Sequence, residues 1–195
     1  MSKKQITYFF TIIASVYLFF GCSSGEQKQP KQSNPESIEK ENAKKQFQVN
    51  FLAYEVEMRK PLAYLSTRMK KFDEEWRNRN IFAEKEDFTK GIEQMKLLCD
   101  SLKNNMDSIS IPEFYDVGLD KKDYETYLSG PKKKFSEAFR QYSLYYGSFK
   151  RSFHSDDTEL SKMFTKNGDS AKEKAEKEID EANENIAHMK KTWQF

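Results

Sequence analysis

The chain contains 195 residues, and its 33 Lys and Arg nearly balance its 31 Asp and Glu, for a formal net charge of +2. This balance gives no support for nucleic-acid binding, which needs a net basic patch or stripe, and the sequence contains no polybasic block to draw a folded domain onto anionic lipid. The length is sufficient for one ordinary hydrophobic core.

The first 21 residues have the layout of a secretory signal. Lys3 and Lys4 precede an apolar run at residues 6–20, and the small Gly21 follows it. A basic start, a short apolar middle and a small residue at the cleavage site are typical of an export signal. An uncleaved membrane anchor is the less favoured alternative, because the run is shorter than the roughly 20 apolar residues that a spanning helix needs.

Cys22 comes directly after this signal, in the sequence LFFGCSS. The segment resembles the lipobox of bacterial lipoproteins, in a relaxed form because Phe19 and Phe20 replace the usual aliphatic and small residues. The resemblance covers residues 1–22 only, and no family is recognised for the rest of the chain. An ordinary secretory signal followed by a chance cysteine is the alternative.

The resemblance implies that Cys22 carries a covalent lipid and becomes the mature N-terminus. Diacylglycerol and palmitate-type acyl chains would then anchor the protein to a bacterial cell membrane, on its extracytoplasmic side. Ser23 after the cysteine implies the outer membrane rather than the inner one, where a cell has both. No other cofactor is expected.

Residues 22–36 have the composition of a flexible linker, since they are polar and lack large apolar side chains. We therefore divide the chain into a signal at 1–21, the lipidated cysteine with its linker at 22–36, and a single domain at 37–195. With Cys22 acylated, Cys99 is the remaining thiol, so an internal disulfide is not expected.

The first predicted helix begins near Asn34. Its apolar residues recur at spacings of three and four from Phe47 to Trp76, which defines one helical stripe. Pro61 removes one backbone hydrogen bond and is expected to bend this helix.

The second predicted helix follows a polar turn at residues 78–80. Its stripe runs from Phe88 to Ile109, and Pro112 ends it. Asp120 can cap a short helix at residues 121–128.

Breaks are predicted inside both remaining helical regions. Residues 129–131, Ser-Gly-Pro, are expected to end the short helix before a longer one with an aromatic stripe. After a turn near Ser155, a short helical piece is expected to end at residues 167–168, Asn-Gly. Ser170 and Glu173 then form a capping-box pattern at the start of the last helix.

Four such stripes and no strand-like alternation predict an all-α fold, an antiparallel up-down four-helix bundle with long first and last helices. An even number of helices places both ends of the domain at one end of the bundle. The first helix is then expected to pair with the last.

Few residues are candidates for catalysis or metal binding. His154 and His188 are interpreted as solvated, because neither lies in the Glu-x-x-His spacing of di-iron bundles. Cys99 lies in an apolar stripe and is predicted to be a small buried residue. The acidic and basic residues at 172–191 are interpreted as solvated ion pairs. We therefore predict no catalytic residue and no metal site.

The aromatic run of the third helix is the strongest candidate for a binding surface. A broad core stripe is the favoured interpretation, whereas an exposed aromatic cluster would indicate a partner groove. A second, weaker patch is formed by tyrosines 115, 124 and 127. The members of the first patch are Tyr142, Leu144, Tyr145, Tyr146 and Phe149.

Three functions stay open. The preferred one is a non-enzymatic, lipid-anchored bundle that binds or spaces another protein of the cell envelope. The second is a carrier of an apolar small ligand, in a pocket lined by Phe139, Tyr142 and Tyr146. The third is an envelope enzyme whose carboxylates converge only in the fold. A homo-oligomer also stays open, because the long first helix can outlast its partners and present an uncovered stripe.

Overall fold

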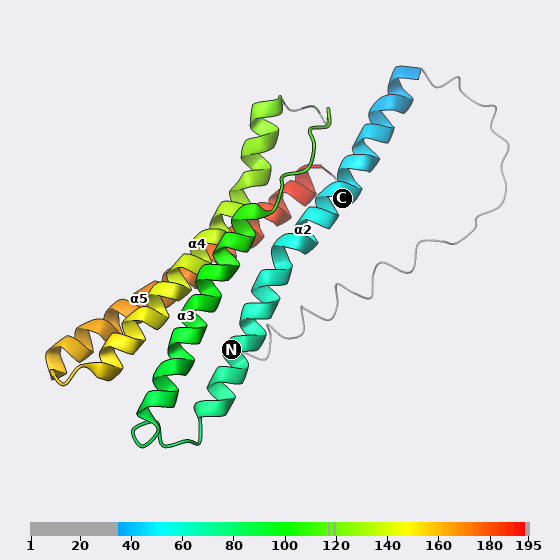
Figure 1. The fold of residues 1–195 in the computed structure, drawn as a ribbon. Coiled ribbons are helices and arrows are strands. Elements are labelled where there is room, and N and C mark those ends of the chain that lie inside the picture. The colour runs from blue at the N-terminus through cyan, green and yellow to red at the C-terminus, as the bar shows by residue number, and fades with distance from the viewer. Residues whose placement is uncertain (1–34, 117, 119, 194–195) are drawn as a thin grey trace. The chain divides into compact units, whose positions relative to one another are not determined.

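The computed structural model describes residues 35–116, 118 and 120–193. These residues form an all-α bundle without strands (Figure 1), which confirms the predicted fold class. The predicted signal, Cys22 and the linker up to residue 34 lie outside the described residues. Within the described residues, no helix combines the length and the apolar character needed to cross a membrane. The helices are α2 (Pro35–Trp76), α3 (Lys85–Ser108), α4 (Lys121–His154) and α5 (Thr158–Thr192).

The four helices alternate in direction. At one end of the bundle, the ring of Phe72 late in α2 stacks on Phe88 early in α3, with centroids 5.9 Å apart. At the other end, Phe47 of α2 packs edge-on against Trp193, directly after α5, with centroids 4.8 Å apart. We call this second end, where α2 begins and α5 ends, the terminal end (Figure 1). The predicted pairing of the first and last helices is confirmed.

The backbones of α4 and α5 have the most extensive contact of the helix pairs. The buried face of α5 is built largely from small residues, namely Gly168, Ala171, Ala175 and Ala182. Small side chains allow two helix axes to approach closely. By contrast, α2 contacts the bundle through large buried side chains, and it runs as one helix through Pro61.

A buried acid fixes α2 against α5. Glu55 is almost fully buried. Its carboxylate accepts a hydrogen bond from Arg59 Nε at 2.9 Å and forms an ion pair with Lys190 Nζ of α5 at 2.6 Å. Arg59 also donates from Nη1 to Asn183 Oδ1 of α5 at 2.9 Å. Because a buried carboxylate needs charged partners in fixed positions, this network sets the register between the two helices.

The helix break predicted at residues 129–131 is wrong, because α4 runs without interruption through Pro131. Tyr124, Leu128 and Pro131 are all buried, so one apolar stripe continues across the proline. A proline inside a helix costs about 3 kcal/mol, which the burial of two large side chains at about 1.5–3 kcal/mol each offsets. The hydroxyl of Tyr54 in α2 also donates a hydrogen bond to the carbonyl of Leu128 at 3.1 Å, so α2 holds the backbone of α4 close to the proline.

The break predicted at residues 167–168 is also wrong, because α5 is continuous there. Gly168 lies buried beneath α4, and a Cβ at this position would lie 3.5 Å from both Tyr145 Cδ2 and Ser148 Cβ. This glycine therefore marks a close contact between two helices and not the end of one.

The start of α5 is set by Asp157 and not by the predicted capping box. The Asp157 carboxylate accepts hydrogen bonds from the backbone N–H groups of Glu159 at 2.8 Å and Leu160 at 3.0 Å. Ser170 and Glu173 lie inside the helix. A carboxylate at this position satisfies backbone donors that would otherwise have no partner.

Candidate functional site

The five residues of the candidate binding patch on α4, for which a core stripe was the favoured interpretation, do not form one exposed cluster. Tyr142 and Tyr146 are buried, Tyr145 and Phe149 are partly buried, and Leu144 is exposed. Tyr145 packs edge-on against Tyr146 at 4.9 Å and stacks on Phe149 at 6.1 Å. Four of the five thus contribute to packing within the bundle.

Burial also limits what the hydroxyls of these tyrosines can do. It raises the pKa of Tyr142 to about 12, and it raises the pKa of Tyr146 still further above its ordinary value. Both phenols therefore stay protonated at neutral pH, and neither can act as a base.

Cys99 is fully buried, as predicted. Burial raises the pKa of its thiol to about 12, so a reactive thiolate is not populated at neutral pH. His154 Nε2 lies 2.8 Å from Thr89 Oγ1, and His188 Nδ1 lies 3.5 Å from Thr192 Oγ1. In the part of the chain that the structure describes, no group of three or more His, Cys, Asp or Glu could hold a metal ion.

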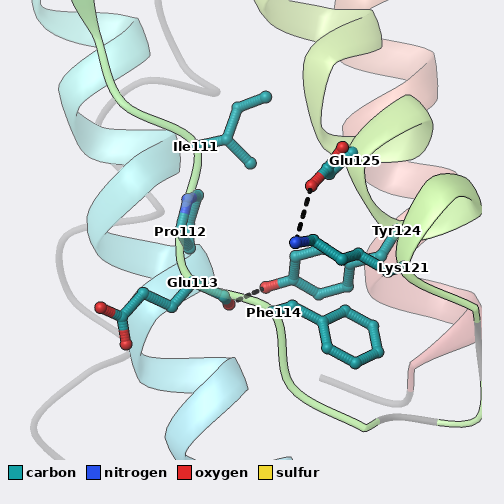
Figure 2. A pocket seen from close by; sticks show the side chains of 7 residues that line it. All are labelled: Ile111, Pro112, Glu113, Phe114, Lys121, Tyr124 and Glu125. Carbon is teal, nitrogen blue, oxygen red and sulfur yellow. Dashed lines mark hydrogen bonds and ion pairs between the residues drawn. The ribbon is translucent and has the colours of Figure 1, made fainter.

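A cleft of about 370 Å³ lies where the connection between α3 and α4 meets the first turns of α4 (Figure 2). It is at the terminal end of the bundle, because Phe47 of α2 packs against Tyr124 of α4 with centroids 5.4 Å apart. The cleft is lined by Ile111, Pro112, Glu113, Phe114, Lys121, Tyr124 and Glu125.

The connection is held over α4 by Tyr124. Its ring is fully buried, and its hydroxyl donates to the backbone carbonyl of Glu113 at 2.7 Å. The ring of Phe114 packs edge-on against it, with centroids 5.2 Å apart (Figure 2). Burial raises the pKa of Tyr124 to about 12, so the hydroxyl remains a donor.

The end of α3 and the start of α4 are both capped near this cleft. Lys132 of α4 donates to the carbonyls of Asp107 at 2.8 Å and Ile109 at 2.7 Å, which lie at the end of α3. Asp120 accepts from the backbone N–H of Asp123 at 2.8 Å, which confirms the predicted cap of α4. A cation at the end of a helix and an anion at its start both complement the helix dipole.

The chemistry of the cleft is that of an apolar contact site. Ile111, Pro112 and the exposed edge of Phe114 supply apolar surface, while Lys121 and Glu125 form an ion pair at 3.9 Å. Small-molecule sites have volumes of about 300–1,000 Å³, so this cleft suits one apolar side chain or a small apolar group.

Of the weaker patch predicted from sequence, Tyr124 lines this cleft. Tyr127 is exposed and packs edge-on against Trp193 at 6.4 Å, and the hydroxyl of Tyr115 accepts a hydrogen bond from Asn50 at 2.8 Å. Sequence reasoning missed residues 111–114 as part of the site. The available signal was the pairing of Pro112 with Phe114 in a short connection.

No family model matches the chain, and neither curated proteins nor solved structures provide a match. The fold defines an all-α helical bundle, a class that serves many unrelated functions.

Proposed function

We propose that this protein is a bacterial lipoprotein whose helical bundle is a non-enzymatic binding or scaffold module of the cell envelope. The observation that carries the proposal is the N-terminal sequence, in which Lys3 and Lys4, an apolar run and Gly21 lead to Cys22. Each methylene buried in lipid contributes about 0.8 kcal/mol, so the two or three long acyl chains of a lipidated N-terminal cysteine hold a protein on a membrane.

The arrangement of the bundle is compatible with such an anchor. The helix that follows the linker, α2, begins at Pro35, and Phe47, about three turns further on, packs against Trp193 at the terminal end. A flexible linker of about 12 residues, from 23 to 34, has a typical end-to-end distance of roughly 20 Å. In this proposal the linker allows the bundle to meet envelope proteins near the membrane, and the cleft at the terminal end accepts an apolar side chain from one of them.

The carrier alternative has less support. It requires an internal pocket lined by Phe139, Tyr142 and Tyr146. The described cleft involves none of the three and lies at the surface, which favours a binding role there.

Lipid anchoring is tested by replacing Cys22 with alanine in a bacterium that produces the full chain. Wild type is expected to incorporate labelled palmitate and to enter the detergent phase on phase separation. The variant is expected to lose the label and to remain as a longer precursor or to enter the aqueous phase. Cys99→Ala is the control, since that thiol is buried in the bundle. Unchanged labelling and mobility for Cys22→Ala would refute the anchor.

The binding role of the cleft is tested by crosslinking on intact cells, followed by purification from detergent-solubilised membranes. One stoichiometric protein partner is expected with wild type, and its yield should fall with Phe114→Ala. Leu160→Ala is the matched control, because Leu160 is similarly exposed but lies on α5, outside the cleft and outside the aromatic run of α4. A co-purified small molecule without a protein partner would favour the carrier.

A further inference from the structure

Helix α2 carries a second apolar face, opposite the one that packs in the core. The core face includes Phe51 and Met58, which are fully buried. Val56 lies two positions before Met58, and at about 100° per residue this spacing places the two side chains on opposite sides of the helix. The members of the outer face are Ile38, Val49, Leu52 and Val56, and each is between 45% and 62% exposed.

The outer face has the seven-residue spacing of paired helices. Asn42, Val49, Val56 and Ala63 recur every seven residues, and Leu52 lies three positions after Val49. Valine at the first position of such a repeat and leucine at the fourth are typical of helices that pack against one another in pairs. The repeat therefore predicts a helical partner for this face rather than a flat surface.

We propose that the partner is α2 of a second copy of this chain, packed antiparallel. The charges on the face decide the direction. A parallel pair would place Lys45 against Lys45 of the partner subunit. Such like-charge contacts oppose association.

An antiparallel pair removes this contact. If Val49 lies opposite the partner's Leu52, then Lys45 lies opposite the partner's Val56. The long methylene stem of lysine can cover an apolar neighbour while its ammonium stays in water, and here the ammonium is paired with Glu41 at 2.7 Å.

The same register brings opposite charges together at each end of the contact, along one of its edges. Glu39 of one copy lies next to the partner's Lys60, and the two-fold symmetry repeats this pair at the other end. Both residues are exposed, and Lys60 is paired with Glu57 on its own helix in the single copy. Ile38 lies opposite the partner's Ala63, a small residue that allows close approach.

The contact runs from Ile38 to Ala63, or about 38 Å of helix at about 1.5 Å per residue. Its fully apolar layers are few, so the dimer is reversible and has a micromolar rather than a nanomolar dissociation constant. The dimer does not depend on the lipid anchor, and failure of one proposal leaves the other standing.

The decisive test is a zero-length carbodiimide crosslink on the purified full chain in detergent, which joins only carboxylates and amines that touch. We expect a crosslink between Glu39 and Lys60 in the dimer. Within one copy these residues are 21 positions apart on the continuous helix α2, or about 32 Å, so the product cannot form inside one chain. Mixing unlabelled with ¹⁵N-labelled chains should give the crosslinked peptide pair with mixed isotopes. Absence of this product at concentrations where dimer is present would overturn the antiparallel register.

Sedimentation velocity on variants supplies the second readout. Leu52→Glu is expected to give a monomer, whereas Leu97→Glu on α3 is the control and is expected to keep the dimer, because Leu97 is also exposed but lies on another helix. Lys60→Glu should weaken the dimer about fivefold, and adding Glu39→Lys should restore it. Wild type that remains monomeric at several hundred micromolar, or a dimer that Leu52→Glu leaves intact, would overturn the proposal.

Discussion

Replacing Gly168 with alanine is expected to stabilise the bundle by about 0.5–1 kcal/mol, because glycine inside a helix is less favourable than alanine by that amount. Gly168 lies in the interior of α5. The new Cβ would lie 3.5 Å from Tyr145 Cδ2 and from Ser148 Cβ, and 3.6 Å from the Tyr145 carbonyl oxygen. These are ordinary van der Waals distances, so no neighbouring atom needs to move.

The measurement is thermal unfolding followed by circular dichroism at 222 nm. For a domain of this size, about 1 kcal/mol corresponds to a rise in Tm of about 2–4 °C. Gly168→Leu tests the packing limit, because further carbon atoms would overlap α4 and should cost about 1–3 kcal/mol.

The sign of the change in Tm distinguishes a helix that continues through Gly168 from a helix that ends there. If the helix ended at Gly168, the glycine would adopt a left-handed conformation and alanine would destabilise the protein by about 1 kcal/mol. Gly118, with φ of +85°, provides that comparison, and Gly118→Ala is expected to lower the Tm. Gly91→Ala is a second comparison with Gly168→Ala, because its Cβ would lie only 3.0 Å from Phe72 Cε2, which is closer than an ordinary van der Waals contact. A lower Tm for Gly168→Ala would refute the continuous helix.

Three further predictions concern buried and charged groups. Glu55→Ala removes the buried acceptor shared by two cations and should cost about 1–3 kcal/mol in urea unfolding, while Glu57→Ala, at an exposed position on the same helix, should cost less than about 0.5 kcal/mol. Cys99 should react with a maleimide only after denaturation, as read from the mass of its peptide, and rapid modification of the native protein would contradict its burial. Hydrogen bonds from Arg140 hold the pKa of Glu137 below its ordinary value, so its contribution to stability is present above the unfolded pKa of about 4.5 and is lost as the pH falls through the lower folded value. Glu137→Gln should therefore lose less stability than wild type between pH 5 and pH 3, and an equal loss would refute this assignment.

The apolar periodicity was sufficient to predict the helices and their order. The stripe from Phe47 to Trp76 and the stripe from Phe88 to Ile109 correspond to the buried faces of α2 and α3. Such stripes are readable in a sequence because a helix that packs on a core buries every third or fourth residue. The capping role of Asp120 was predictable for a similarly local reason, since it acts three residues along the chain.

Residues that break helices were misleading, because their effect depends on what the helix packs against. Pro131 and Gly168 both lie inside continuous helices, where burial of neighbouring side chains offsets the local cost. The lipid on Cys22 stays a prediction, because it is a covalent modification and not a feature of the fold.

The sequence alone determined the all-α class, the order of the helices and their inward faces, because each of these follows from local spacing. Only the tertiary structure decided that Tyr145 and Phe149 pack within the bundle and that a cleft lies between residues 111–114 and α4. It also revealed that the apolar side chains on the outer face of α2 are exposed within the part of the chain that the structure describes. The physical reason is that exposure and pocket shape depend on contacts between segments distant in the chain, and the hydrogen bond from Tyr124 to the Glu113 carbonyl is one such contact.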